Sequence, residues 1–182
     1  APTASLPVTN IHDATLKYEF TVCLHQPLYA VNLQTIPRLL EWIAVNKVFG
    51  ADHFVIYTLT ATDEIREYLQ PLVNTGLLET HLWDQDFSKD TILDLFNQRV
   101  VLNECIYRHM YSSKHIALLD FDEFPTPHSH ENWSQVISNS PCAKTPSASF
   151  LNAFFPMNFL GDIPRSHLNV TVLQKFRRAP SF

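Results

Sequence analysis

The hydrophobic and polar positions along this chain follow two different periods, and each change of period marks a new element. Dense runs of apolar, aromatic and β-branched residues predict strands at residues 18–25, 53–59, 77–83 and 115–119. Apolar residues that recur every three or four positions predict helices over about residues 35–49, 62–75 and 97–111. Gly50 and Gly76 follow the first two helices and supply the left-handed stop at which helices commonly end.

The order strand, helix, strand, helix, strand, helix, strand is typical of an α/β fold with a mostly parallel, Rossmann-type central sheet flanked by helices. Residues 115–119 are apolar almost without a break, so we expect this strand at the middle of the sheet, where both faces are covered. Residues 77–83 alternate between apolar and polar, which predicts an edge or half-exposed strand. The polar, Pro-containing residues 1–17 predict an N-terminal arm or linker, and residues 18–182 predict one domain.

Three carboxylates follow the most apolar strand, at Asp120, Asp122 and Glu123. In open α/β sheets ligands bind beyond the carboxyl ends of the strands, so chemistry is expected here. Like charges this close repel each other, and a divalent cation relieves the repulsion. Carboxylate oxygens suit hard cations such as Mg²⁺ and Mn²⁺, which also bind phosphate oxygens. We therefore interpret Asp120 and Asp122 as a metal site.

Two other polar clusters receive a plainer interpretation. Asp84 and Asp86 also form an Asp-x-Asp triplet, but they follow the alternating strand, and we interpret them as a loop or a helix-capping pair. His128 and His130 lie in a Pro-rich segment just after the acidic cluster, which favours exposed surface over metal ligands.

The composition excludes several classes of protein. With 182 residues, of which 46% are hydrophobic, the chain can bury the core of one domain and does not have the profile of a disordered protein. Its net charge of −5, with a basic cluster confined to Lys175, Arg177 and Arg178, argues against a nucleic-acid partner. No apolar run reaches the roughly 18–20 residues that span a bilayer. The chain begins at Ala1 rather than Met, so we expect a targeting or anchoring segment to precede it.

Sequons and cysteines bear on the cellular compartment. Asn132 and Asn169 each begin an Asn-x-Ser/Thr sequon, which suits glycosylation in the secretory pathway. The three cysteines cannot all pair within one chain. Cys23 and Cys105 lie in apolar patterns, and we interpret them as small buried hydrophobic residues.

Several stretches, in matching order and spacing over roughly residues 20–180, resemble glycosyltransferase family 92. They are residues 23–29, 39–43, 50–57 and 76–83, then Gln98, residues 103–105, Arg108 and residues 117–124. The resemblance implies a GT-A fold, Mn²⁺ or another divalent cation, a UDP-sugar donor with galactose as its sugar, and a glycan acceptor. It also implies a type II membrane protein of the Golgi lumen, with its membrane anchor outside this chain.

The resemblance also assigns roles to individual residues. Asp120 and Asp122 occupy the Asp-x-Asp motif, in which the first carboxylate contacts the ribose or the water shell and the second binds the metal. Glu123 fits the acidic continuation of that motif, and we place it in the donor site. His25 and Tyr57 end the first two strands and would face the uracil and ribose.

The resemblance is less specific on the third helix and towards the C-terminus. Gln98 and Asn103 occupy family positions on that helix and would line the donor pocket, the alternative being ordinary polar helix surface. The family's domain continues past the position of Phe182 and draws its acceptor site, and often a catalytic carboxylate, from there. The resemblance therefore implies a domain that is incomplete in its acceptor half. The catalytic base is not assigned, and Asp162 is only a candidate by position.

The reaction that the resemblance implies is an inverting transfer of galactose. A base deprotonates an acceptor hydroxyl, which attacks the anomeric carbon while the metal holds the departing UDP. One alternative is a non-catalytic domain that binds a nucleotide sugar or serves only in an interaction. Another is an aspartate-dependent phosphohydrolase, but its motif carries Thr where Phe124 lies and follows the first strand of the domain rather than the fourth.

Overall fold

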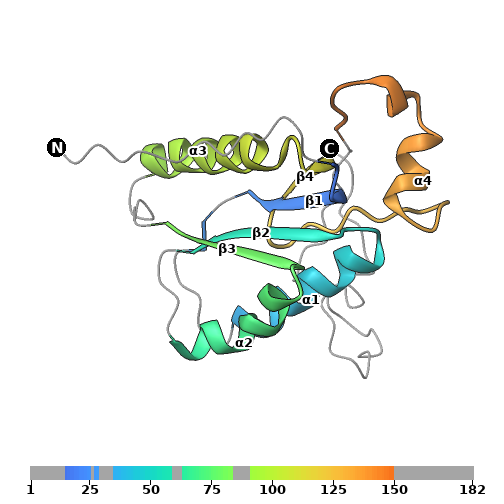
Figure 1. The fold of residues 1–182 in the computed structure, drawn as a ribbon. Helices are drawn as coiled ribbons and strands as arrows, with labels where there is room; N and C mark the ends of the chain where they lie inside the picture. Colours follow the sequence, from blue (N-terminus) through green and yellow to red (C-terminus); the bar gives the residue numbers. More distant parts are fainter. Residues whose placement is uncertain (1–14, 26, 29–34, 59–62, 84–90, 150–182) are drawn as a thin grey trace, which may run out of the picture.

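The computed structural model describes residues 15–25, 27–28, 35–58, 63–83 and 91–149. Its strands are β1 (Tyr18–Leu24), β2 (His53–Thr58), β3 (Leu78–Leu82) and β4 (Ser113–Leu119). Its helices are α1 (Thr35–Val48), α2 (Asp63–Asn74), α3 (Thr91–His109) and α4 (Trp133–Ser138), with a short 3₁₀ helix η1 (Pro141–Lys144). Strands and helices alternate from β1 to β4 in the predicted order, and α4 and η1 follow the last strand (Figure 1).

The sheet consists of four parallel strands in the order β3-β2-β1-β4. The chain runs outward from β1 through β2 to β3 and then returns to the other side of β1 to form β4. This reversal creates a switch point between the carboxyl ends of β1 and β4, which is where ligands bind in open α/β sheets. The α/β fold with a parallel sheet and flanking helices is confirmed.

The position of β4 differs from the expectation based on its apolar sequence. Within the described sheet β4 is an edge strand rather than a central one, and Leu118 is 40% exposed. The inner strands β1 and β2 bury polar residues of their own, such as Thr21, whose Oγ1 lies 2.6 Å from Ser113 Oγ. An apolar run therefore identified a strand correctly without revealing its place in the sheet. The half-exposed character of β3 is confirmed.

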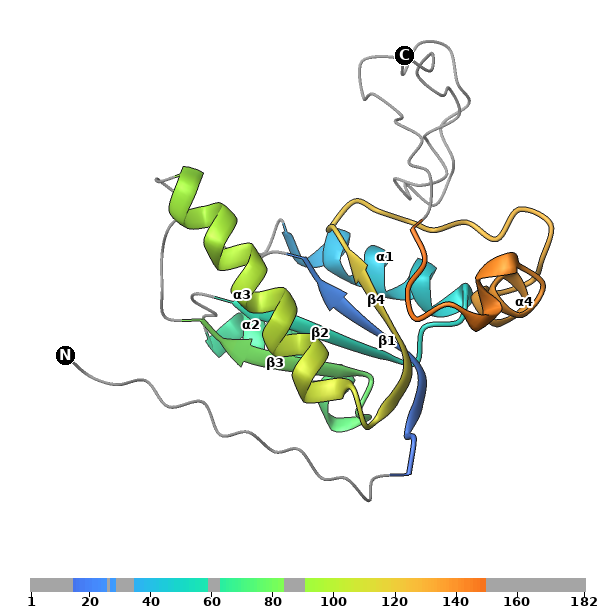
Figure 2. The same cartoon turned by 90° about the horizontal axis from the view of Figure 1, so that it is seen from above.

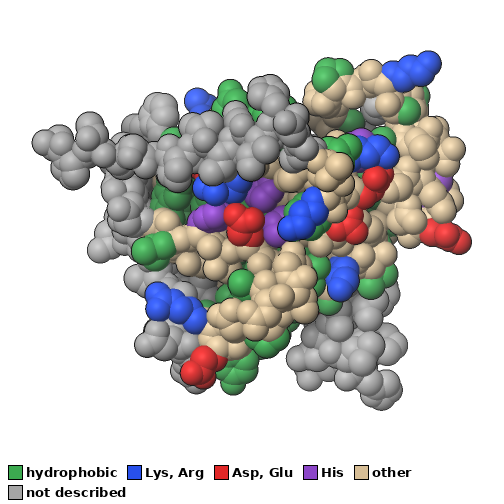
Figure 3. Space-filling model, in the orientation of Figure 1, with side chains coloured by type: hydrophobic (Ala, Val, Ile, Leu, Met, Phe, Trp, Pro, Cys, Tyr) green, Lys and Arg blue, Asp and Glu red, His purple; other side chains and the backbone are tan. Residues whose placement is uncertain are grey.

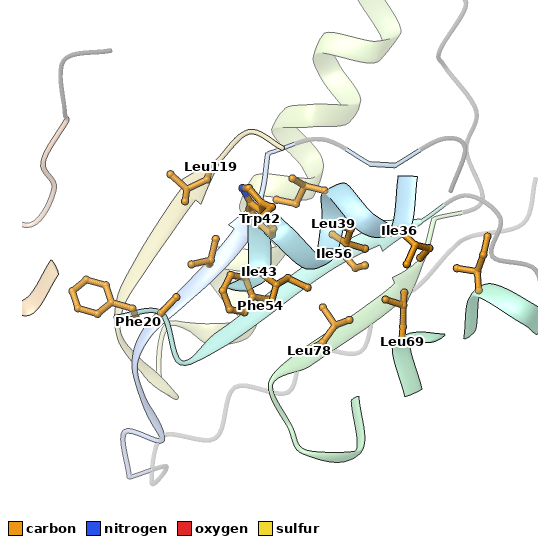
Figure 4. Close-up of a cluster of buried hydrophobic side chains, with 14 of the residues drawn as sticks. Phe20, Ile36, Leu39, Trp42, Ile43, Phe54, Ile56, Leu69, Leu78 and Leu119 are labelled. Atoms are coloured by element: carbon orange, nitrogen blue, oxygen red, sulfur yellow. The ribbon is translucent and has the colours of Figure 1, made fainter. Parts of the chain in front are cut away.

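Helices cover both faces of the sheet, with α1 and α2 on one face and α3 on the other (Figure 1, Figure 2). Successive side chains of a strand point to opposite faces, so the sheet has two cores. The larger core, beneath α1 and α2, includes Val22, Leu39, Trp42, Phe54 and Leu78 (Figure 4). The smaller core, beneath α3, consists of Cys23, Val55, Tyr57, Val101 and Cys105. Every residue of β2 is buried between these layers.

A disulfide bond joins Cys23 of β1 to Cys105 of α3, 82 positions apart in the sequence. Both residues are fully buried, as predicted, and the structure adds the bond between them, a pairing that the sequence left open. Cys23 belongs to the face of β1 that α3 covers, and Cys105 belongs to the buried face of α3. Their Cα atoms lie 6.2 Å apart, within the usual range for a disulfide. Periodicity places each residue on a face but does not reveal which residue faces it.

The start of the third helix also differs from the prediction. α3 begins at Thr91 rather than at about Asn97. Thr91 is followed three positions later by Asp94, a pattern that favours a helix start and that apolar spacing alone does not use. Among the helices of the described residues, none is both long enough and apolar enough to cross a membrane.

Candidate functional site

The acidic turn after β4 is closed by its own hydrogen bonds. The backbone N–H of Glu123 donates to the carbonyl oxygen of Asp120 at 3.0 Å. In return the backbone N–H of Asp120 donates to Oε2 of Glu123 at 3.0 Å. The Glu123 carboxylate therefore fixes the backbone at Asp120, the residue that begins the turn.

Helix α1 holds this turn from below. The indole Nε1–H of Trp42 donates to the carbonyl oxygen of Asp120 at 3.0 Å, and Nδ2 of Asn46 lies 3.5 Å from the carbonyl oxygen of Glu123. Trp42 and Asn46 are fully buried, so these bonds are shielded from competing water. The Phe121 ring packs against Trp42 at 6.3 Å between ring centroids, and the guanidinium of Arg38 lies over its centroid at 5.5 Å. The backbone of the acidic turn is thus anchored to the core.

His25 and Asp120 meet at the switch point between β1 and β4. His25 Nδ1 lies 2.8 Å from Oδ1 of Asp120, and the backbone N–H of His25 donates to the carbonyl oxygen of Leu119 at 2.8 Å. The two side chains are 38% and 44% exposed, so the pair is accessible to a ligand. Figure 2 shows β1 and β4 side by side, so two predicted site residues 95 positions apart are brought together.

The two aspartates of the turn suit a hard divalent cation. Asp122 lies two residues beyond Asp120 with its side chain exposed. Mg²⁺ and Mn²⁺ commonly take one or two protein carboxylates and complete their shell with water and phosphate oxygens. Two accessible carboxylates on a turn with a fixed backbone meet that requirement. The residues present therefore fit the cation that the sequence suggests.

Tyr57, near the carboxyl end of β2, lies in the smaller core rather than on the surface of the protein. Its side chain is buried between β2 and α3, and its hydroxyl donates to Oε2 of Glu104. Glu104 also accepts a hydrogen bond from Nε of Arg108 at 2.7 Å. Burial, together with the Glu104 carboxylate, raises the pKa of Tyr57 well above its usual value. Tyr57 is therefore a neutral hydrogen-bond donor within a buried network.

The two predicted positions on α3 have different surroundings. Gln98 is half-buried, whereas Asn103 is exposed and donates through Nδ2 to the carbonyl oxygen of Arg99 at 2.7 Å. A hydrogen bond within its own helix is what the alternative of ordinary polar helix surface expects for Asn103. A donor contact at either residue stays a prediction.

Asn132 has a structural role at the start of α4. Its Oδ1 accepts a hydrogen bond from the backbone N–H of Gln135 at 3.0 Å, which makes it the N-cap of this helix. Glycosylation at Asn132 stays a prediction. His128 is exposed and His130 is half-buried, close to their interpretation as surface residues. Other residues that the sequence singled out lie outside the described residues: Asp84, Asp86, Asp162, Asn169 and the basic cluster of Lys175, Arg177 and Arg178.

The support from α1 was missed by sequence reasoning, which assigned Trp42 only to the apolar face of a helix. A signal was available in Asn46, one turn further along the same face. A buried amide must find hydrogen-bond partners, so an Asn on an apolar helix face indicates a nearby backbone segment that needs support.

A parallel sheet with an accessible acidic turn at its switch point defines an α/β domain of the class that binds ligands at the carboxyl edge of the sheet. Comparison with known families identifies the family within this class: the profile of glycosyltransferase family 92 matches residues 18–171. The chain belongs to glycosyltransferase family 92.

Three proteins of Arabidopsis thaliana are similar to this chain. Galactan β-1,4-galactosyltransferase GALS2 is 33% identical over 113 residues, which cover 59% of this chain and 20% of the relative. Galactan β-1,4-galactosyltransferase GALS3 is 31% identical over 120 residues, covering 63% and 22%. Galactan β-1,4-galactosyltransferase GALS1 is 27% identical over 92 residues, covering 48% and 18%. The matched region thus spans about a fifth of the length of each relative.

Proposed function

We propose that this chain is the donor-binding part of a metal-dependent glycosyltransferase that transfers galactose from a UDP-sugar to a glycan acceptor with inversion. The observation that carries the proposal is the contact of His25 with Asp120 at the switch point of a family 92 domain. The names of the three Arabidopsis relatives support galactose as the donor sugar and a glycan as the acceptor.

In this proposal the acidic turn receives the diphosphate of the donor. Asp122 and Asp120 hold a divalent cation, with Mn²⁺ as the first choice, and the cation would neutralise the charge of the departing UDP. Trp42 and Glu123 fix the turn before the donor arrives, which reduces the ordering that binding requires. His25 orients the Asp120 carboxylate through Oδ1.

The nucleoside would lie against the segment that leaves β1. After His25 the chain passes the carboxyl end of β2, where the backbone N–H of Leu28 donates to the carbonyl oxygen of Tyr57 at 2.8 Å. This contact holds the segment after β1 against the carboxyl end of β2. Tyr57 then supports the nucleoside site from beneath. Glu123, Gln98 and Asn103 complete the proposed set of donor residues.

The proposed location is the Golgi lumen, in a type II membrane protein whose anchor lies outside this chain. The buried Cys23–Cys105 disulfide supports an oxidising compartment, because such bonds are rare in the reducing cytosol. The sequons at Asn132 and Asn169 fit the same route.

The deciding experiment is calorimetric titration of the intact protein with UDP, with and without Mn²⁺. Wild type is compared with Asp122→Ala and with Glu67→Ala, which removes an exposed carboxylate on α2, away from the acidic turn. We expect UDP to bind wild type and Glu67→Ala only when Mn²⁺ is present, and Asp122→Ala to lose this binding. Folded wild-type protein that ignores UDP in the presence of Mn²⁺ would refute the donor site.

Turnover separates the enzyme from the alternative of a non-catalytic domain. The intact protein is incubated with UDP-galactose, Mn²⁺ and a panel of β-linked galactan oligosaccharides, and extension of each acceptor is measured by mass spectrometry. Extension by one hexose supports the transferase. Binding of UDP without extension of any acceptor or release of UDP would favour a nucleotide-sugar-binding domain instead.

A further inference from the structure

A second cluster of potential metal ligands lies at the opposite edge of the sheet. His53 is the first residue of β2, Glu79 is the second residue of β3, and His109 is the last residue of α3. Because the strands are parallel, these positions mark the amino edge, whereas Asp120 follows the carboxyl end of β4. Figure 3 shows histidine and acidic side chains gathered below α3. The cluster is therefore separate from the proposed donor site.

The ligand atoms of these three residues converge on one point. His53 Nε2 lies 3.4 Å and His109 Nε2 lies 3.8 Å from Oε2 of Glu79. All three atoms lie within 4.8 Å of one another. Zn–N and Zn–O bonds of about 2.0–2.2 Å in a tetrahedron separate neighbouring ligand atoms by about 3.3–3.6 Å. The observed spacing is thus close to that of a zinc site before the ion draws its ligands together.

The hydrogen bonds of His53 leave its other nitrogen available to a cation. Its Nδ1 lies 2.8 Å from the carbonyl oxygen of Gly76, which can only accept, so Nδ1 carries the hydrogen. Its Nε2 faces Oε2 of Glu79 at 3.4 Å, and a cation could lie between these two atoms. A backbone carbonyl that fixes the tautomer in this way is typical of metal-binding histidines. Tyr18 stacks on the His53 ring at 4.2 Å and shields it.

His109 supplies an independent observation. Its side chain is 6% exposed, and Nε2 is buried without a hydrogen bond among the described residues. Buried polar atoms nearly always have a partner, so one that points at a carboxylate without bonding to it requires an explanation. Burial lowers the pKa of His109 to about 4, which keeps the ring neutral and able to act as a ligand. A cation between His109 and Glu79 accounts for the arrangement.

The second carboxylate oxygen of Glu79, Oε1, is held by a neighbouring histidine, which leaves Oε2 to act as a metal ligand. His81 Nε2 lies 2.6 Å from Oε1 of Glu79, which orients the carboxylate and directs Oε2 towards His53 and His109. The neighbouring His53 and His81 side chains lower the pKa of Glu79 far below its usual value, so the carboxylate is charged. Two imidazoles and one carboxylate suit Zn²⁺, whereas the all-carboxylate turn at Asp120 suits Mn²⁺.

We propose that His53, Glu79 and His109 bind a zinc ion, with His81 holding the Glu79 carboxylate in position. The ion ties β2 and β3 to the end of α3 on the face that the smaller core occupies. Its role is structural, because the site lies at the edge of the sheet away from the acidic turn. This proposal does not depend on the proposed transferase activity.

The test measures zinc on the intact protein purified without a histidine tag. The protein is dialysed against a chelator and titrated with Zn²⁺ in competition with a chromophoric chelator. We expect wild type to bind about one equivalent of zinc per chain at this site. Replacing a second-sphere partner typically weakens binding about 10–100-fold, so His81→Ala should do so and His109→Gln should weaken it more.

Two controls connect the result to the cluster. His128→Gln removes an exposed histidine, and Asp122→Ala removes the proposed Mn²⁺ ligand; both should retain the zinc equivalent. Co²⁺ in place of Zn²⁺ should give wild type the visible absorption of a tetrahedral site, which decides the matter even if His109→Gln does not fold. Folded wild type that shows neither zinc retention nor this spectrum, or His109→Gln that binds zinc as tightly as wild type, would overturn the proposal.

Discussion

The indole Nε1–H of Trp42 donates to the backbone carbonyl of Asp120 at 3.0 Å, and so helix α1 fixes the position of the acidic turn relative to the sheet. The same carbonyl accepts a second hydrogen bond from the backbone N–H of Glu123 at 3.0 Å, so the turn and the helix share one acceptor. Trp42 also touches the Phe121 ring in the same turn. One side chain thus couples the core of the domain to the proposed donor site.

Replacing Trp42 by Phe should therefore affect both stability and binding. Loss of the indole donor removes one of the two hydrogen bonds to the Asp120 carbonyl, which is expected to lower the free energy of unfolding by about 0.5–1.5 kcal/mol. Denaturant unfolding measures this loss, and calorimetry should show weaker UDP affinity with Mn²⁺. Trp133→Phe is a matched control, because it removes the 2.7 Å indole bond to the Pro125 carbonyl outside the turn. An equal loss of UDP affinity in both variants would contradict a specific role for Trp42.

Replacing His25 by Ala should separate binding from stability. The His25–Asp120 contact is partly exposed, and such pairs contribute less than about 1 kcal/mol to folding. The unfolding midpoint should therefore change little, while the apparent affinity for Mn²⁺ with UDP falls because the Asp120 carboxylate loses its orientation. His128→Ala, which removes an exposed histidine, should leave both quantities as in wild type. Unaltered Mn²⁺ affinity in His25→Ala would show that the contact has no part in the site.

Replacing Tyr57 by Phe tests whether this residue touches the donor or only supports it. The change removes the hydroxyl that donates to Glu104, and we expect a loss of about 1–3 kcal/mol in the free energy of unfolding. UDP affinity should stay at the wild-type value, because the hydroxyl is directed into the layer beneath α3. A fall in affinity without loss of stability would instead support a direct donor contact.

Removing the disulfide should destabilise the domain as a whole. For a loop of 82 positions between Cys23 and Cys105, the chain-entropy effect and typical measurements give a loss of about 2–5 kcal/mol. Reductant should therefore lower the unfolding midpoint of wild type. The double variant with Ala at both positions should start at the lower midpoint and not respond to reductant. A midpoint of wild type that is unaffected by full reduction would show that packing alone holds α3 on the sheet.

The fold was predictable from the sequence because strands and helices alternate with clear changes of period. Periodicity also predicted the acidic turn, since Asp120 follows a strand directly. It did not reveal which strand is central, because the buried polar residues of β1 and β2 are satisfied by partners such as the Thr21–Ser113 pair. Local pattern reports how apolar a strand is, whereas its place in the sheet depends on contacts between distant segments.

The residues missed by sequence reasoning share one property: their roles depend on partners far along the chain. Asn46 supports a turn 77 positions away, and His53 lies beside Glu79 and His109 only because β2, β3 and α3 come together. Asn46 stands out only as a polar residue on an apolar helix face, and nothing in the sequence near His53 names Glu79 or His109 as its neighbours. Spatial convergence of polar atoms, rather than a motif, is what distinguishes them.

The register of β1 against β4 constrains how this domain can vary over evolutionary time. The two strands pair position by position up to Leu24 and Leu119, and His25 and Asp120 are the next residues on each strand. Deleting a single residue within β4 would bring Phe121 to the level of His25 and turn every following side chain to the opposite face. Changes of length should therefore accumulate outside these two strands, while the spacing from Ser113 to Asp120 stays fixed in any descendant that still uses the acidic turn.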